Sequence, residues 1–114
     1  MSQKRAQAVT VVESPMLTLN VSKSAALAAK YRLPSSGNVE FGDAGGMIGY
    51  GVDALALYRR AAYFVDKILK GVKPADLPIE QPTKFELVIN VKTASALGIT
   101  VPRIMLLRAD KIIE

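Results

Sequence analysis

The chain contains no cysteine and no histidine among its 114 residues. Without cysteine it can form neither a disulfide nor a thiolate metal site, and it has no cysteine nucleophile. Without histidine it lacks the usual general base near neutral pH and the commonest zinc ligand. These two absences exclude most hydrolase and transition-metal chemistry. The sequence therefore predicts a protein that is not an enzyme and uses no cofactor.

Long hydrophobic runs are also missing. No stretch approaches the roughly 20 apolar residues that a membrane-spanning helix needs. The first residues, MSQKRAQAVTVVESPM, carry two basic side chains and then a short apolar run that ends at Glu13. They contain neither the apolar core nor the small-residue cleavage site of a signal peptide. As it stands, the sequence is therefore expected to be cytoplasmic.

The charge is unbalanced, with 15 Lys and Arg against 10 Asp and Glu and a net charge of +5. Clustered basic residues would indicate a nucleic-acid partner, because they release counterions from phosphates. Here the basic residues are spread from Lys4 to Lys111 among carboxylates, and the densest stretch, residues 59–73, includes Asp66. This distribution is typical of ordinary solvated faces, so no nucleic-acid partner is expected.

A hydrophobic content of 50% over this length is enough for one compact core. We therefore expect a single α/β domain over residues 1–114, with residues 1–5 flexible. The β-branched run at 8–12 predicts a short buried strand. Asn20 or Ser22 can begin a helix that Pro34 ends, and brief apolar pieces at 39–41 and 47–48 predict short strands between glycine-rich loops.

The strongest helix signal covers residues 53–70. Asp53 can cap its first turn, Gly71 suits the left-handed position that follows a helix, and Pro74 prevents continuation. After it, the apolar segment FELVIN at 85–90 predicts a strand covered on both faces.

Residues 84–114 are expected to form a crossover strand followed by C-terminal helices. Asn90 can cap a short helix that Gly98 ends, and Pro102 suits the start of a last helix that carries Met105, Ala109, Ile112 and Ile113 on one side. Strands that alternate with helices predict an α/β fold in which helices flank a mostly parallel sheet.

The segment AGGMIGYGVD, residues 44–53, is the one place where local chemistry suggests a site. A glycine-rich loop before a helix start can present backbone N–H groups to a carboxylate. Its glycine spacing matches neither dinucleotide-binding nor phosphate-binding loops, so a plain structural turn is the alternative. Asp53 is either a ligand contact or a helix cap, and Tyr50 either contacts a ligand or packs on the sheet. Glu40 and Asp43 are more typical of solvated loop charges than of a metal site.

A long string of the sequence resembles one protein family. The run LYRRAAYFVDKILKGVKPADLPIEQPTKFELVIN at 57–90, continued by VKTASALGITVP and RADKIIE, resembles the C-terminal stretch of ABC-transporter substrate-binding proteins related to tryptophan- and branched-chain-type binding proteins. ESPML at 13–17, LAAKYRLPS at 27–35 and the AGGMIGYG segment resemble that family in the same order. The resemblance covers the C-terminal lobe of a periplasmic-binding-protein-like fold. From this resemblance, we expect the first lobe, the leading part of the second lobe and a secretion signal to be absent.

This resemblance implies a non-enzymatic protein that binds a small molecule between two α/β lobes, usually in the periplasm, and passes it to an ABC permease. The ligand is expected to carry a carboxylate. The implied ligand-binding residues lie at the carboxyl ends of strands, as in other open α/β sheets. They are Ser14, Pro15, Met16, Glu40, Tyr50, Gly51 and Asp53. The alternative is the product of a truncated or split gene that acts as a self-associating module without a ligand.

The C-terminal region is rich in apolar residues that such a short tail cannot leave in water. We therefore expect a homodimer, formed by this region or by exchange of the last helix, or association with a separate first-lobe chain. The other possibility is that the tail folds back over its own sheet. The apolar residues are Leu97, Ile99, Val101, Ile104, Met105, Leu107, Ile112 and Ile113.

Overall fold

The computed structural model describes residues 6–114, so the expectation of a flexible segment at 1–5 lies outside the described residues. The chain divides into two compact units. One contains the chain up to Gly51 together with Glu86–Glu114, and the other is Val52–Phe85.

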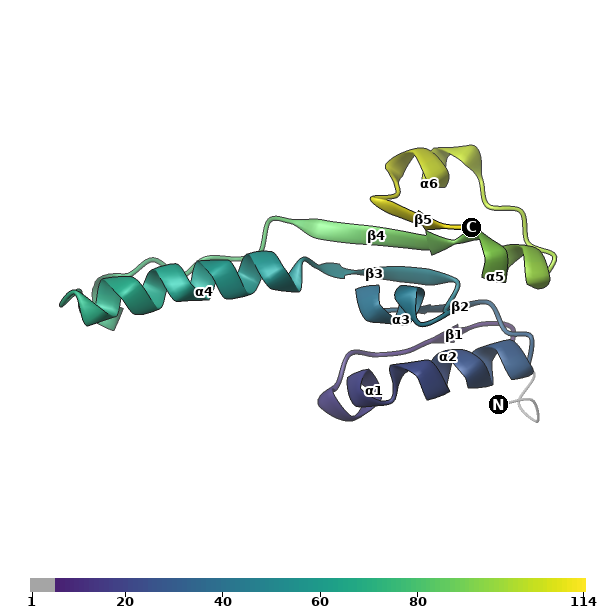
Figure 1. Ribbon diagram of the computed structural model, residues 1–114, viewed down its shortest axis with the longest axis horizontal. Coiled ribbons are helices and arrows are strands. Elements are labelled where there is room, and N and C mark those ends of the chain that lie inside the picture. The colour runs from purple at the N-terminus through teal and green to yellow at the C-terminus, as the bar shows by residue number, and fades with distance from the viewer. Residues whose placement is uncertain (1–5) are drawn as a thin grey trace. The chain divides into compact units, whose positions relative to one another are not determined.

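The first unit is built on a five-stranded sheet whose order follows the sequence, β1-β2-β3-β4-β5 (Figure 1). The pairs β1/β2, β2/β3 and β4/β5 are parallel. The Asn90 amide, at the end of β4, donates to the Met47 carbonyl beside the start of β3 at 2.9 Å, so β4 runs opposite to β3. The expected mostly parallel sheet flanked by helices is confirmed. The strands are β1 Val9–Thr10, β2 Ser35–Gly37, β3 Ile48–Val52, β4 Phe85–Asn90 and β5 Lys111–Ile113.

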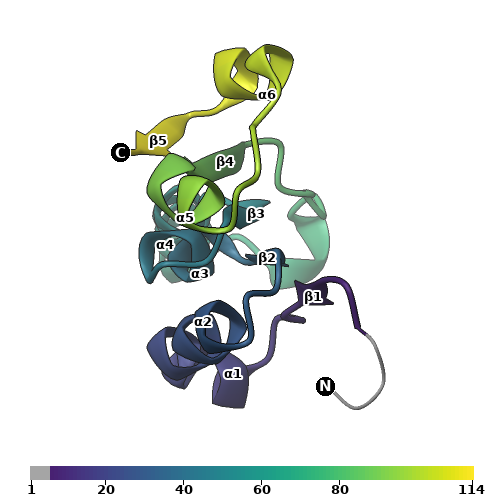
Figure 2. The same cartoon turned by 90° about the vertical axis from the view of Figure 1, so that its right-hand side faces the viewer.

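Five helices accompany this sheet, and α2, α3 and α5 line one side of it (Figure 2). They are α1 Pro15–Leu19, α2 Val21–Lys30, α3 Val39–Asp43, α5 Val91–Ala96 and α6 Arg103–Arg108. Residues of α2, α3 and α5 and the second half of β4 form the core of the first unit. The core residues are Ala25, Ala28, Phe41, Val88, Ile89 and Ala94.

Phe41 is the largest fully buried side chain, and glycines make the space for its ring. A Cβ atom at Gly46 would lie 2.1 Å from the ring atom Cε1 of Phe41, and one at Gly37 would lie 2.7 Å from Cγ. Real carbon atoms do not approach this closely, so any larger residue would displace the ring. These two glycines therefore have a packing role.

The second unit consists of the long helix α4, Ala54–Leu69, a short 3₁₀ turn at Pro74–Asp76 and the segment that returns to Phe85. The predicted boundaries of this helix are confirmed. The Asp53 carboxylate accepts a hydrogen bond from the Ala56 amide at 2.9 Å, and Gly71 has a φ of +97°, the left-handed conformation that ends helices. Arg60 on α4 forms an ion pair with Glu80 on the returning segment.

The strand and helix at residues 85–98 also match the prediction. Val88, Ile89 and Asn90 are buried in succession, as expected for a strand covered on both faces. The Asn90 side chain accepts a hydrogen bond from the Thr93 amide at 2.9 Å and so caps α5. Gly98, with a φ of +75°, follows this helix.

Two predicted elements are wrong. The apolar piece at 39–41 belongs to helix α3, because the Asn38 side chain accepts a hydrogen bond from the Phe41 amide and begins a helical turn there. The last helix does not continue to Ile113. Helix α6 ends at Arg108, and Lys111–Ile113 pairs with Val88–Asn90 as the edge strand β5. Pairing with a buried neighbouring strand outweighs the helical spacing of these apolar residues.

Candidate functional site

The carboxyl ends of β1, β2 and β3 lie at one edge of the sheet, because these three strands are parallel. The segments that follow them contain most of the predicted ligand-binding residues. Ser14, Pro15 and Met16 follow β1, and Glu40 follows β2. Tyr50 and Gly51 lie within β3, near its carboxyl end. The topology thus brings three separate parts of the sequence to the same sheet edge.

The segment after β1 turns directly into α1. The half-buried Ser14 caps this helix, and its Oγ accepts a hydrogen bond from the Leu17 amide at 3.3 Å. Pro15 suits the first turn because it has no N–H to satisfy. Met16 is 70% exposed, which is a large exposure for an apolar side chain. Ser14 is therefore committed to the helix, whereas Met16 offers an accessible flexible surface.

Glu40 lies in the first turn of α3 and is exposed. Asp43, three residues on, ends that helix and forms an ion pair with Lys111 at 2.8 Å. The two carboxylates therefore have different surroundings and do not form a metal-type pair. Across the part of the chain that the structure describes, no three carboxylate, histidine or cysteine side chains are grouped as a metal site would require.

The glycine-rich segment is a turn followed by a strand. Residues 48–52 form the strand β3. They are therefore not part of a loop that presents free backbone amides to an anion, which was one of the two expectations for this segment. A Cβ atom at Gly49 would lie 2.9 Å from the carbonyl oxygens of Asn38 and Val39, so this glycine allows close backbone packing. Gly51 has more space, since its Cβ atom would lie 3.7 Å from the nearest atom, on Val39. Tyr50 is 58% exposed.

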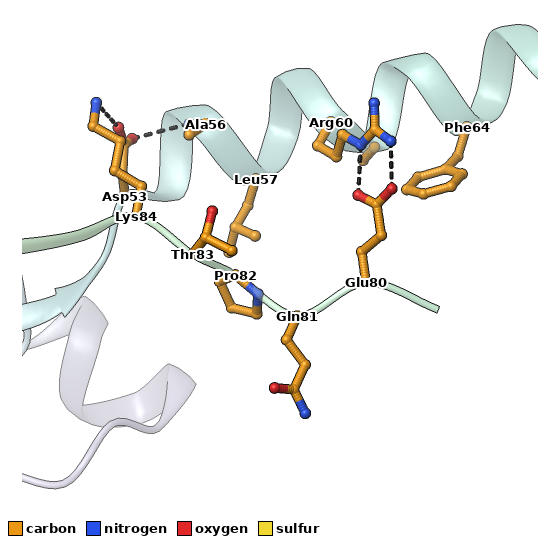
Figure 3. A pocket seen from close by; sticks show the side chains of 11 residues that line it. Asp53, Ala56, Leu57, Arg60, Phe64, Glu80, Gln81, Pro82, Thr83 and Lys84 are labelled. Atoms are coloured by element: carbon orange, nitrogen blue, oxygen red, sulfur yellow. Dashed lines mark hydrogen bonds and ion pairs between the residues drawn. The ribbon is translucent and has the colours of Figure 1, made fainter. Parts of the chain in front are cut away.

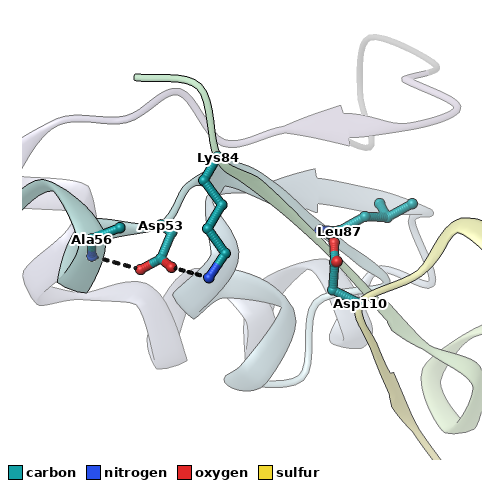
Figure 4. A network of polar contacts seen from close by, with 5 residues as sticks. All are labelled: Asp53, Ala56, Lys84, Leu87 and Asp110. Carbon is teal, nitrogen blue, oxygen red and sulfur yellow. Dashed lines mark hydrogen bonds and ion pairs between the residues drawn. The ribbon is translucent and has the colours of Figure 1, made fainter. Parts of the chain in front are cut away.

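Asp53 belongs to the second unit, where its carboxylate already has a hydrogen-bond partner and an ion-pair partner (Figure 4). One oxygen accepts from the Ala56 amide at 2.9 Å, and the other pairs with Lys84 Nζ at 2.7 Å. The Asp53 carboxylate thus occupies the start of α4, which is the place where the sequence predicted that an anionic group of a ligand could bind. A ligand carboxylate at this helix end would meet a like charge.

The Lys84 ammonium lowers the pKa of the Asp53 carboxyl, and the Ala56 amide adds to this effect. Both groups stabilise the ionised form, and the partial burial of Asp53, which acts in the opposite direction, is the weaker influence. Asp53 is therefore held as a carboxylate that can cap α4 and bind a cation. It is unsuited to donate a proton.

A groove of about 450 Å³ lies within the second unit, between α4 and the returning segment (Figure 3). Leu57, Ala61 and Phe64 contribute its apolar lining. The Asp53–Lys84 and Arg60–Glu80 ion pairs belong to its wall, so the four charges are neutralised within the unit. The groove offers a place for an apolar group, and it contains no pairing of a nucleophile with a base.

Sequence reasoning missed the partners of these charged residues. Lys84 immediately precedes the strand at 85–90 and Asp53 immediately follows the strand at 48–52. Their pairing would have been visible only if the two strands had been recognised as antiparallel neighbours. Asn38 was also missed, although an asparagine directly before an apolar residue, here Val39, is a recognisable helix-cap signal.

No helix among residues 6–114 is long and apolar enough to cross a bilayer. This agrees with the absence of long hydrophobic runs in the sequence.

Comparison with solved structures shows two close likenesses in fold. A conserved domain protein from Vibrio cholerae O1 biovar El Tor superposes with a TM-score of 0.88 at 24% identity, covering 96% of this chain and 37% of that one. An ABC domain from Streptococcus pneumoniae in complex with L-Trp gives 0.86 at 25% identity, covering 98% and 39%. A ligand-free, open substrate-binding protein with adhesive properties from Clostridium difficile gives 0.63 at 16% identity, covering 93% and 36%.

This chain therefore spans less than two fifths of the length of these structures. No curated protein sequence matches it. A sequence profile described as ABC transporter substrate binding protein matches residues 2–113, which is nearly the whole chain. Together with the α/β architecture, this match shows that the chain belongs to the ABC transporter substrate-binding protein family.

Proposed function

We propose that this chain is a non-enzymatic ligand-binding lobe and that its ligand is a small molecule carrying a carboxylate. Its family binds small molecules in the periplasm and works with ABC permeases. The observation that carries the proposal is the meeting of the segments after β1, β2 and β3 at one sheet edge. Open α/β sheets bind ligands at this edge.

An amino acid is the ligand class that these residues suit best. Exposed Glu40 offers a negative charge for an α-amino group, and Tyr50 and Met16 offer apolar surface for a side chain. The L-Trp complex of the Streptococcus pneumoniae relative, at 25% identity, supports this class.

One lobe alone covers less of a ligand than the 70–90% that is usual for small-molecule pockets. High affinity therefore requires a second protein surface, from another copy of this chain or from a separate first-lobe chain, whereas the lobe alone should bind its ligand weakly, in the millimolar range. An ABC permease is the proposed recipient of the ligand.

A thermal-shift screen of amino acids and aromatic carboxylates tests the proposal. A ligand at 100 times its dissociation constant stabilises the folded state by about 2.7 kcal/mol, which gives a measurable shift in Tm. Glu40→Gln should remove the shift for amino acids, whereas Asp76→Asn, on the second unit, should leave it unchanged. If no compound shifts Tm for the parent chain at millimolar concentration, the proposed binding function is wrong.

A further inference from the structure

Helix α4 carries an exposed apolar stripe with the spacing of a helix–helix seam. Its members are three, four, three and four residues apart, namely Leu55, Tyr58, Ala62, Val65 and Leu69. Such 3-4 spacing is the narrow seam by which one helix packs against another. The stripe is distinct from Leu57, Ala61 and Phe64, which line the groove beside the returning segment.

Within the second unit, residues 52–85, no segment covers the seam. None of the residues of α4 is buried, and Leu55, Tyr58, Val65 and Leu69 are 67%, 74%, 54% and 82% exposed. A continuous row of large apolar side chains along a helix marks an association surface, in contrast to single exposed apolar residues.

The charges beside the seam are self-complementary. Arg59 and Asp66 are one heptad apart and adjoin the seam on the same side. An antiparallel pair of α4 helices related by a two-fold axis near Ala62 places Arg59 opposite Asp66 of the second copy. The two-fold symmetry repeats this pair, so the dimer contains two Arg59–Asp66 contacts. On the other side the positions are Ala54, Ala61 and Ile68, which carry no charge. The Asp66–Lys70 pair at 2.9 Å is exposed, so it costs little to share or exchange.

From the spacing, the exposure and these charges we infer that α4 is a homodimerisation helix, which pairs antiparallel with α4 of a second copy. The same patch then serves both copies and the assembly closes at two. This association requires only the second unit and does not depend on ligand binding.

The first test is the mass in solution, measured by light scattering and sedimentation from about 1 µM to about 1 mM, a range that covers weak and strong dimers. We expect a concentration-dependent rise towards twice the sequence mass of 12.2 kDa. A mass that stays at the monomer value throughout would overturn the inference. It would instead point to a different polypeptide, such as a first-lobe chain, as the occupant of the seam.

Two matched substitutions locate the surface. Val65→Glu places a charge in the seam, whereas Ile79→Glu makes a similar change at a fully exposed residue of the same unit that lies outside α4. Val65→Glu should raise the dimer dissociation constant about a hundredfold, because each dimer carries two copies of the change. Ile79→Glu should leave it unaltered. If both variants change the dissociation constant equally, or if Val65→Glu does not change it, the seam is not the dimer contact.

Charge reversal tests the antiparallel orientation. Arg59→Asp should weaken the dimer by placing like charges together, and adding Asp66→Arg should restore it. The absence of cysteine allows a further check that does not rely on weakened variants. Ala62→Cys should form a disulfide-linked dimer on mild oxidation and Ile79→Cys should not. Failure of Ala62→Cys to cross-link above the Ile79→Cys level would refute a two-fold axis at this helix.

Discussion

Asp53 is the residue at which the functional and the structural interpretation meet. It caps α4 through the Ala56 amide and pairs with Lys84. Asp53→Ala should lower the unfolding free energy by about 1 kcal/mol through loss of the cap. Asp53→Asn keeps the capping oxygen and should cost less. Denaturant unfolding of both variants measures the difference, and an equal loss from both would show that charge, and not capping, dominates.

The same residue should make stability depend on pH. Because its pKa is lower in the folded protein, Asp53 contributes stability above its unfolded pKa of about 3.9, and this contribution is lost as the pH falls through the folded value. The difference in unfolding free energy between the parent and Asp53→Asn should therefore shrink as the pH falls from 6 to about 2. A difference that stays constant over this range would contradict the assignment of the lowered pKa to Asp53.

Two glycines of the segment at 44–53 should respond differently to the same substitution. Gly46→Ala puts a carbon 2.1 Å from the Phe41 ring and should destabilise the fold by about 1–3 kcal/mol or more. Gly51→Ala meets its nearest neighbour at 3.7 Å and should be neutral or slightly stabilising. Thermal unfolding distinguishes them. A neutral Gly46→Ala would mean that Phe41 is not held by this close packing.

At the scale of elements, β4 and α4 should differ in local stability. The end of β4 is buried and lies between β3 and β5, whereas no residue of α4 is buried. Amide hydrogen exchange should therefore be slowest at Val88 and Ile89 and much faster along α4 at low protein concentration. At high concentration the α4 amides should gain protection if the helix dimerises. Uniform protection of both elements in dilute solution would contradict this prediction.

At the scale of the whole molecule, the expected association surface changes. The sequence placed the dimer contact in the C-terminal apolar region, but β5 pairs with β4, so part of that region folds against its own sheet. Ile104 and Leu107 remain exposed there. We expect Leu107→Glu to leave the dimer dissociation constant unchanged while Val65→Glu raises it. Light scattering on the two variants decides between the surfaces, and the reverse result would favour the C-terminal one.

The sequence alone determined the elements whose signals are local. The helix at 54–69 has a capping aspartate before it and a glycine after it, and the strand at 85–90 has a continuous apolar centre. Such signals depend only on neighbouring residues, so they can be recognised without knowledge of the fold. The family was also recognisable, because the long string at 57–90 has no simple origin in composition.

Only the tertiary structure decided what depends on residues far apart in the sequence. Ile112 and Ile113 form a strand because β4 lies beside them, and Gly46 is needed because the Phe41 ring lies against it. Lys84 holds Asp53 across 31 positions of sequence, a pairing that no local pattern encodes. In each case the free energy comes from a partner that folding brings close. The local sequence therefore indicates the element, and the distant contact determines its role.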